Sequence, residues 1–268
     1  VANLAALGST VTRYGYDRAA QASGIVHLGI GAFHRAHQAW YTDLAMEAGD
    51  RDWAITGVSL RSPSVAEQMN PQDGLYTVTE RSEAGWQSRL VGAVREVLVA
   101  RDQRAAVIDR LADPACHVAS LTVTEKGYCR AADGSLDFAL ADSGSLYALI
   151  AEGLRRRHDA GLPGLTLLSC DNLADNGQQL AHLMAQYLGR HDPALLAWFE
   201  AECACPSTMV DRIVPATTDA DRAGLAARIG LEDQAAVLTE PFSQWVIEDR
   251  FAGPRPRWEA VGAELVSD

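Results

Sequence analysis

Two glycines separated by one residue, Gly29 and Gly31, directly follow the apolar run Ile25–Leu28. A sharp Gly-x-Gly turn after a buried strand lets backbone N–H groups approach a pyrophosphate, whereas a third glycine three residues later serves helix-to-strand packing. Here the bulky run Phe33–Arg35 occupies the place of that third glycine. The pattern therefore predicts a dinucleotide-binding turn in which another contact replaces the usual packing of the third glycine.

Polar residues also follow three other predicted strands. The stretches are SLRSP at 59–63, TVTEKGY at 122–128 and SCDN at 169–172. In an open parallel sheet the ligand crevice lies beyond the carboxyl ends of the strands. We therefore expect all four segments to face one site.

The end of the second strand bears on the choice of cofactor. An NAD site usually has an acidic residue there, about 20 residues beyond the glycine turn, which accepts a hydrogen bond from the ribose 2′-hydroxyl. In this sequence no carboxylate follows until Glu67, and Ser59 and Arg61 stand in its place. Taken alone, a guanidinium at this point favours a 2′-phosphate and hence NADP.

Lys126 is the single lysine in a chain that has 22 arginines. It falls in a strand-end loop that faces the predicted site, where a compact ammonium suits a space that a guanidinium would not fit. The alternative is that one lysine must fall somewhere. We predict that Lys126 contacts the cofactor or a substrate carboxylate and that it does not abstract a proton.

Residues that could form a metal site or a hydrolase nucleophile are present, but not at the spacing that these sites require. His34 and His37 lie three apart without a third metal ligand, so we interpret them as residues of the cofactor turn or of a helix cap and predict no metal site. Cys203-x-Cys205 has no partner pair, and the five scattered cysteines are typical of reduced thiols. Ser169–Cys170 lacks the Gly-x-Ser-x-Gly context of a hydrolase nucleophile.

Strand-like and helix-like segments alternate along the chain, which predicts an α/β fold with a doubly wound parallel sheet, Rossmann-like, and an antiparallel hairpin extension. Flanking the hairpin turn at 82–85 are two predicted strands, Leu75–Arg81 and Trp86–Val91. The other predicted strands are 25–30, 53–59, 117–122 and 165–169, and the predicted helices are 36–48, 101–111, 145–158 and 177–188. The only stretch with the composition of a boundary is 252–258, so residues 1–268 are predicted to form one dinucleotide-binding domain.

The composition excludes several classes of partner. A formal net charge of −12 argues against nucleic acid and anionic membrane surfaces, which require dense Lys and Arg. No apolar run approaches the ~20 residues of a membrane span, and the N-terminus lacks a signal-peptide pattern. We therefore expect a cytoplasmic protein that acts on a small molecule.

Five segments together carry a family resemblance: IVHLGIGAFHRAHQAWYTD, SLTVTEKGYC, LLSCDNLADNG, STMVDRIVPATT and EPFSQWVIEDRF. In this order they resemble the successive motifs of the polyol-specific long-chain dehydrogenases, the family of mannitol 2-dehydrogenase and fructuronate reductase (D-mannonate oxidoreductase). The similarity runs from about Gly24 to the last residue. With Lys126, TEKGY is more similar to the fructuronate reductase branch.

The resemblance implies hydride transfer between a keto sugar or keto-sugar acid and its alcohol, with NAD as the expected cofactor and NADP left open. By resemblance, Asn172 stabilises the oxyanion and Asp211 accepts hydrogen bonds from the polyol. Phe33 and Arg35 would line the adenosine and pyrophosphate. The full set of expected cofactor residues is Gly29, Gly31, Ala32, Phe33, Arg35, Ser59, Arg61, Thr124, Glu125 and Asn172.

Family members are nearly twice as long and continue into a mostly helical domain that carries a Lys-x-x-x-x-Asn-x-x-His motif. This sequence contains no such motif, so the resemblance implies that the general-base lysine lies in a C-terminal domain absent from the chain. We therefore expect a fragment that is inactive alone. The alternative is a stand-alone nucleotide-binding or sensor module without catalysis.

Overall fold

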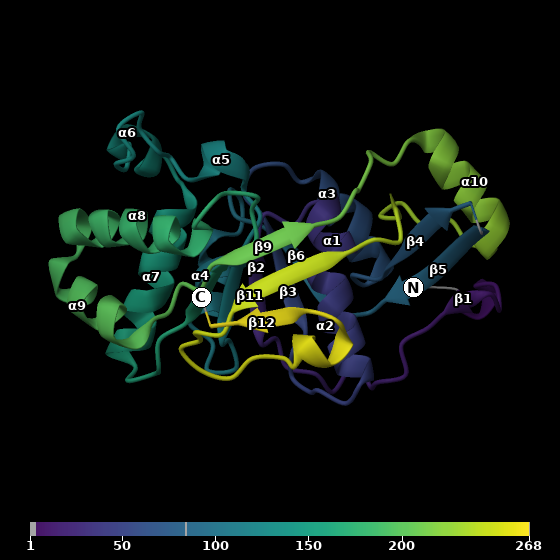
Figure 1. The fold of residues 1–268 in the computed structure, drawn as a ribbon, viewed down its shortest axis with the longest axis horizontal. Helices are drawn as coiled ribbons and strands as arrows, with labels where there is room; N and C mark the ends of the chain where they lie inside the picture. Colours follow the sequence, from purple (N-terminus) through teal and green to yellow (C-terminus); the bar gives the residue numbers. More distant parts are fainter. Residues whose placement is uncertain (1–3, 84, 268) are drawn as a thin grey trace.

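A five-stranded parallel sheet forms the centre of the computed structural model, which describes residues 4–83 and 85–267. Its strands are β2 (Ile25–Leu28), β3 (Ile55–Ser59), β6 (Val94–Val99), β7 (Val118–Leu121) and β8 (Thr166–Ser169). They lie in the order β6-β3-β2-β7-β8 (Figure 1). The order reverses between β2 and β7, and in sheets of this kind ligands bind beyond the strand ends at such a switch point. The α/β expectation is confirmed.

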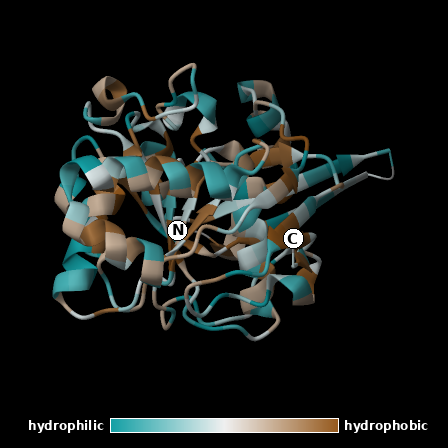
Figure 2. Cartoon of the chain, turned by 60° about the vertical axis from the view of Figure 1, so that its left-hand side comes forward, coloured by the Kyte–Doolittle hydropathy of each residue, from teal (hydrophilic) through white to brown (hydrophobic). Residues whose placement is uncertain are grey.

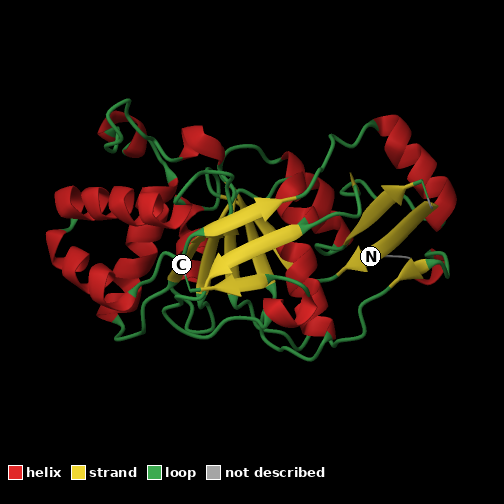
Figure 3. Ribbon diagram, in the orientation of Figure 1, coloured by secondary structure: helices red, strands yellow, loops and turns green. Residues whose placement is uncertain are grey.

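Helices cover one face of this sheet. Figure 3 shows them in red on one side of the molecule, where they pack against the apolar side chains of β2, β7 and β8. These helices are α4 (Arg104–Leu111), α7 (Leu146–Asp159), α8 (Asn176–His191) and α9 (Pro193–Glu202). The starts of α7 and α8 lie within one residue of the predicted positions.

The second face of the parallel sheet is covered by two helices and a small sheet, not by helices alone. It packs against α1 (Ala32–Ala36), α2 (Gln38–Glu47) and a small sheet in the order β12-β11-β9. The strands of the small sheet are β9 (Thr208–Asp211), β11 (Gln244–Glu248) and β12 (Glu264–Val266). Trp245 of β11 is buried, and its ring lies 4.7 Å from that of Trp258. This second sheet was not predicted.

The predicted hairpin is present as β4 (Tyr76–Ser82) and β5 (Gly85–Val91), although Ala84 of its turn lies outside the described residues. It belongs to a four-stranded sheet in the order β1-β5-β4-β10, with β1 at Val11–Thr12 and β10 at Val237–Thr239. Figure 2 shows the hairpin extending from the body of the molecule with hydrophilic residues toward its tip. The first four residues of β4, at 76–79, are buried.

The predicted helix at 36–48 is divided in the structure, because α1 ends at Ala36 and α2 begins at Gln38. The stretch 252–258 leads from β11 into the short helix η3 (Trp258–Val261), which begins at its last residue. The remaining elements are η1 (Leu4–Ala6), α3 (Ser64–Met69), η2 (Asn70–Gln72), α5 (Thr124–Gly127), α6 (Phe138–Ala141) and α10 (Asp219–Ile229). Of the helices in the described ranges, none combines the length and apolar character needed to span a bilayer.

Candidate cofactor and substrate site

The turn after β2 is held against the end of β7. Gly29 has a φ of +100°, and a Cβ at this position would lie 2.1 Å from the carbonyl oxygen of Thr122. The Thr122 hydroxyl donates to the carbonyl oxygen of Gly29 at 2.9 Å. The backbone N–H of Gly29 donates to Val58 of β3 at 2.8 Å. Gly29 is therefore required by the close approach of three strand ends.

A pair of stacked histidines takes the place of the third glycine. His34 occupies that position of the pattern, and its ring stacks on His27 of β2 with centroids 3.3 Å apart and planes inclined by 13°. Both side chains are buried. The helix-to-strand contact that a glycine usually provides is thus made by two aromatic rings. His37 occupies a cap position, as interpreted, because it lies between α1 and α2. Its side chain makes no cap hydrogen bond and is buried instead, with Nε2 2.8 Å from the carbonyl oxygen of Gln244.

His27 also ties β2 to β7 through hydrogen bonds. Its Nδ1 lies 2.8 Å from Ser120 Oγ, and its Nε2 lies 2.8 Å from Thr122 Oγ1. Because the Thr122 hydroxyl donates its proton to Gly29, it accepts from Nε2–H, which leaves Nδ1 to accept from Ser120. Burial lowers the pKa of His27 to about 3. His27 is therefore neutral in the folded protein.

This neutral histidine makes stability depend on pH. Its folded-state pKa lies below the unfolded value, so the unfolded chain binds the extra proton and stability falls as pH drops from about 6.5 toward 3. Between pH 7 and pH 5 we expect His27 to account for a loss of about 2 kcal/mol. Urea unfolding at both values should show this loss.

A His27→Gln variant should lose stability at pH 7, because the hydrogen bonds to β7 are disturbed, but its further loss on acidification should be smaller by that amount. The exposed His182, whose Nε2 lies beside the neutral Gln186 side chain, provides a matched control, and His182→Gln should not reproduce the change expected for His27→Gln. An equal fall for His27→Gln and the wild-type protein would contradict the assignment.

Asp171 organises the loop after β7, and the sequence analysis did not single it out. Its carboxylate accepts from the backbone N–H groups of Val123 at 3.0 Å and Thr124 at 2.9 Å, and from the Tyr128 hydroxyl at 3.0 Å. Thr124 has a φ of +64°, a costly conformation for a β-branched residue. The three hydrogen bonds to Asp171 hold Thr124 in this backbone conformation. The signal was present in SCDN, where the aspartate precedes the asparagine that was chosen.

An Asp171→Asn variant should loosen this loop. The amide nitrogen is a donor and cannot accept from the backbone N–H groups, so one of them loses its partner. We expect a loss of about 1–3 kcal/mol in the free energy of unfolding. Amide hydrogen exchange should show faster exchange at Val123 and Thr124. Exposed Asp175, after β8, is the control, and unchanged exchange in Asp171→Asn would contradict this role.

The expected cofactor residues around the turn occupy different environments. Gly31 precedes α1, and a Cβ built there meets only the Gly29 carbonyl oxygen, at 3.8 Å. Open space therefore lies beside Gly31. Ala32 and Phe33 are half-buried in the first turn of α1, and the Phe33 ring stacks on His37 with centroids 5.0 Å apart.

Arg35 requires a correction. Its side chain is buried, with Nη1 donating to the carbonyl oxygen of Ala235 at 2.5 Å and Nε to that of Gly31 at 3.2 Å. The guanidinium lies over the Tyr76 ring, whose hydroxyl donates to the Arg35 carbonyl oxygen. Through these contacts the Arg35 side chain points toward the four-stranded sheet and anchors α1 there. The expectation that it lines the pyrophosphate is not supported.

Ser59 and Arg61 lie at the carboxyl end of β3, next to the Gly29 turn. The Ser59 hydroxyl donates to the carbonyl oxygen of Ser62 at 2.5 Å, so its proton is already engaged. Arg61 is exposed, and within the described ranges its guanidinium makes no hydrogen bond or ion pair. Arg61 is therefore available to a ligand beside the turn, whereas Ser59 offers only its lone pairs.

The remaining candidates come from three other elements. Asn172 follows β8 and is exposed, and no hydrogen bond to the described residues occupies its amide. Thr124, Glu125 and Lys126 are exposed on α5, and Asp211 is exposed at the end of β9. Hydrogen bonds through Asp171 join the strand ends of β7 and β8 beside the turn. Among the described residues, no hydrogen bond or ion pair joins Lys126 or Asp211 to Asn172.

No group of three or more metal-ligating side chains gathers in residues 4–83 and 85–267. All five cysteines are free thiols, as the sequence predicted. Burial raises the pKa of Cys205 and Cys116 to about 12, so these thiols stay protonated and unreactive.

Comparison with known proteins gives these features a context. The model of the mannitol dehydrogenase Rossmann domain matches residues 23–260. The chain belongs to this family. A mannitol 2-dehydrogenase of Aspergillus terreus is 41% identical over 265 residues, covering 91% of this chain and 52% of the relative. The D-mannonate oxidoreductase of Escherichia coli is 40% identical over 273 residues, covering 96% and 56%.

A solved structure with the same fold is the ternary complex of Pseudomonas fluorescens mannitol 2-dehydrogenase with NAD and D-mannitol. It has a TM-score of 0.95 at 37% identity, and the match covers 100% of this chain and 57% of that one. The chain spans about half the length of the curated relatives it matches.

Proposed function

We propose that this chain is the cofactor-binding part of an NAD-dependent oxidoreductase that interconverts a keto sugar or keto-sugar acid and its alcohol. The observation that carries the proposal is the turn at Gly29–Gly31, which lies at the switch point of the sheet and leaves open space at Gly31. Family membership and the NAD named for the Pseudomonas fluorescens relative support it.

The residues of the chain would divide the chemistry among them. NAD would supply the hydride acceptor when bound beside the turn. Asn172 would donate its amide N–H to the developing alkoxide oxygen, and Asp211 would accept hydrogen bonds from substrate hydroxyls. Lys126 would pair with a substrate carboxylate. The proton of the substrate hydroxyl would be taken by a lysine of a C-terminal helical domain, as the family resemblance implies.

Gly31 provides a sharp test of the turn. A Gly31→Val side chain would project into the open space where a pyrophosphate approaches, with little cost to the fold because the nearest atom lies 3.8 Å from the Cβ. We expect at least about tenfold weaker binding of NADH, a loss of about 1.4 kcal/mol, in a fluorescence titration. Gly253, where an added Cβ also meets nothing within 4 Å, gives the control variant Gly253→Val. Equal NADH affinities in the two variants would contradict binding of the cofactor at this turn.

Arg61 should decide how strictly the chain prefers NAD. Since its exposed guanidinium has no partner in the described structure, it can reach a 2′-phosphate, and we expect measurable NADPH binding that is weaker than NADH binding. Arg61→Ala should reduce NADPH affinity by up to about tenfold and leave NADH affinity within about twofold. The exposed Arg130 supplies the control substitution. NADPH binding tighter than NADH binding in the wild-type chain would overturn the NAD assignment.

A further inference from the structure

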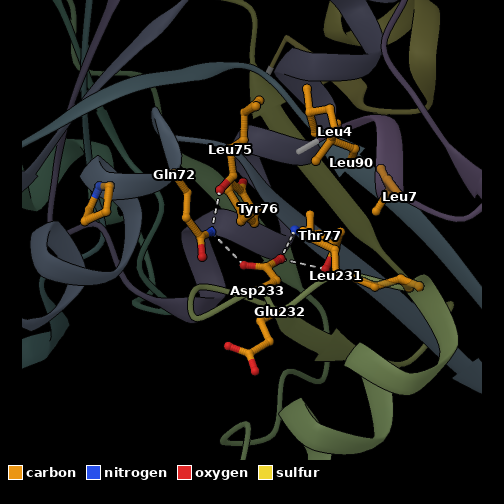
Figure 4. A pocket seen from close by; sticks show the side chains of 12 residues that line it. Leu4, Leu7, Gln72, Leu75, Tyr76, Thr77, Leu90, Leu231, Glu232 and Asp233 are labelled. Atoms are coloured by element: carbon orange, nitrogen blue, oxygen red, sulfur yellow. Dashed lines mark hydrogen bonds between the residues drawn. The ribbon is translucent and has the colours of Figure 1, made fainter. Parts of the chain in front are cut away.

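An apolar cavity of about 180 Å³ borders the four-stranded sheet, and none of the candidate cofactor or substrate residues named above is part of its lining. Its walls are formed by η1, by β4 and β5 of the hairpin, and by the end of α10 (Figure 4). The apolar side chains that line it are Leu4, Leu7, Pro71, Leu75, Leu90, Ile229 and Leu231. An engineered apolar cavity of about 150 Å³ binds benzene. The space therefore suits one ring or a short alkyl chain.

One end of the cavity is acidic. Asp233 is buried there, and its carboxylate accepts from Gln72 Nε2 at 2.8 Å, from the Thr77 N–H at 2.6 Å and from the Thr77 hydroxyl at 2.7 Å (Figure 4). The backbone N–H of Ala235 donates a further hydrogen bond to this carboxylate at 3.0 Å. Asp233 is thus fully engaged with the protein. The neighbouring Glu232 is exposed, and no ion pair or side-chain hydrogen bond of the described structure involves it.

We propose that this cavity binds a small apolar molecule that carries a protonated amine. The leucine and isoleucine walls would take up the apolar group, because its burial removes apolar surface from water. The amine would pair with Glu232 at the acidic end. An anionic ligand of the same size would face two carboxylates, so the charge of the lining selects against it.

The site borders the anchor of the cofactor turn without overlapping it. Tyr76 and Asp233 line the cavity, and both also contact the surroundings of Arg35 through the Tyr76 hydroxyl and the Ala235 backbone. Gly31, at the start of α1, is not part of the lining. A ligand in the cavity and NADH at the turn should therefore bind at the same time.

Three probes of equal size but different charge test the proposal: benzylamine, benzyl alcohol and benzoate. They are titrated into the chain with labelled leucine and isoleucine methyl groups, and binding is followed in ¹H–¹³C NMR spectra. We expect the methyl signals of Leu7, Leu90 and Ile229 to shift with benzylamine and more weakly with benzyl alcohol. Because an exposed ion pair contributes up to about 1 kcal/mol, the amine should bind up to about fivefold more tightly than the alcohol. Benzoate should shift none of them.

A surface substitution isolates the charge. Glu232→Gln should reduce the affinity for benzylamine to that for benzyl alcohol and leave the alcohol unaffected, whereas Glu67→Gln on α3 should change neither. Filling the space with Leu231→Trp should abolish the shifts from both probes, and Leu140→Trp at an exposed site should preserve them. Saturating NADH should leave the benzylamine titration unchanged.

Several results would overturn the proposal. They are the absence of shifts at the cavity methyl groups with benzylamine, binding of benzoate as tight as that of the amine, and competition between benzylamine and NADH. Equal loss of amine and alcohol affinity in Glu232→Gln would also contradict the assigned ion pair. Because the methyl signals report on the cavity itself, every outcome except the competition with NADH can be read whether or not the proposed cofactor binds.

Discussion

The series of hydrogen bonds from His27 through Thr122 to the carbonyl oxygen of Gly29 is the constraint on which the proposed site depends. It fixes the distance between the ends of β2 and β7 at the point where the strand order reverses. Since Gly29 has no room for a Cβ beside Thr122, only a glycine lets the turn approach β7 closely enough to form these hydrogen bonds. The position of Gly31, and with it the open space for a ligand, follows from that contact.

Polar groups rather than apolar packing alone hold α1 in place. His34 stacks on His27 at one side, while Arg35 and Arg212 donate to backbone carbonyl oxygens at the other. Both guanidinium groups are largely buried, which is costly unless each is matched by acceptors in good geometry. Directional contacts of this kind permit one orientation of a five-residue helix that is too short to be stable by itself. The family pattern Phe-His-Arg thus has a structural reason that a glycine could not meet.

The sequence predicted elements whose apolar pattern is local and failed where packing decides. The strand after Gly24 and the hairpin at 76–91 have continuous or alternating apolar residues, and both were found. The three-residue strand β12 and the four-residue strand β9 are too short for periodicity to be seen. The direction of a long side chain is equally invisible in a sequence, so Arg35 was placed toward the ligand although it points to Ala235. Asp171 was missed because SCDN marks a polar strand end without showing which residue of the motif contacts the loop 48 residues away.

Buried and exposed polar residues therefore have different parts in this site. Asn176 is buried and holds the start of β9 against the loop after β8, donating to the carbonyl oxygens of Asp171 at 2.9 Å and Thr208 at 3.0 Å. Through this junction the backbone positions of Asn172 and Asp211 are fixed relative to each other, although their side chains remain exposed and no hydrogen bond joins them. The scaffold thus fixes the backbone positions of the two proposed substrate contacts. The final geometry of their side chains depends on the molecule or chain segment that binds at this surface.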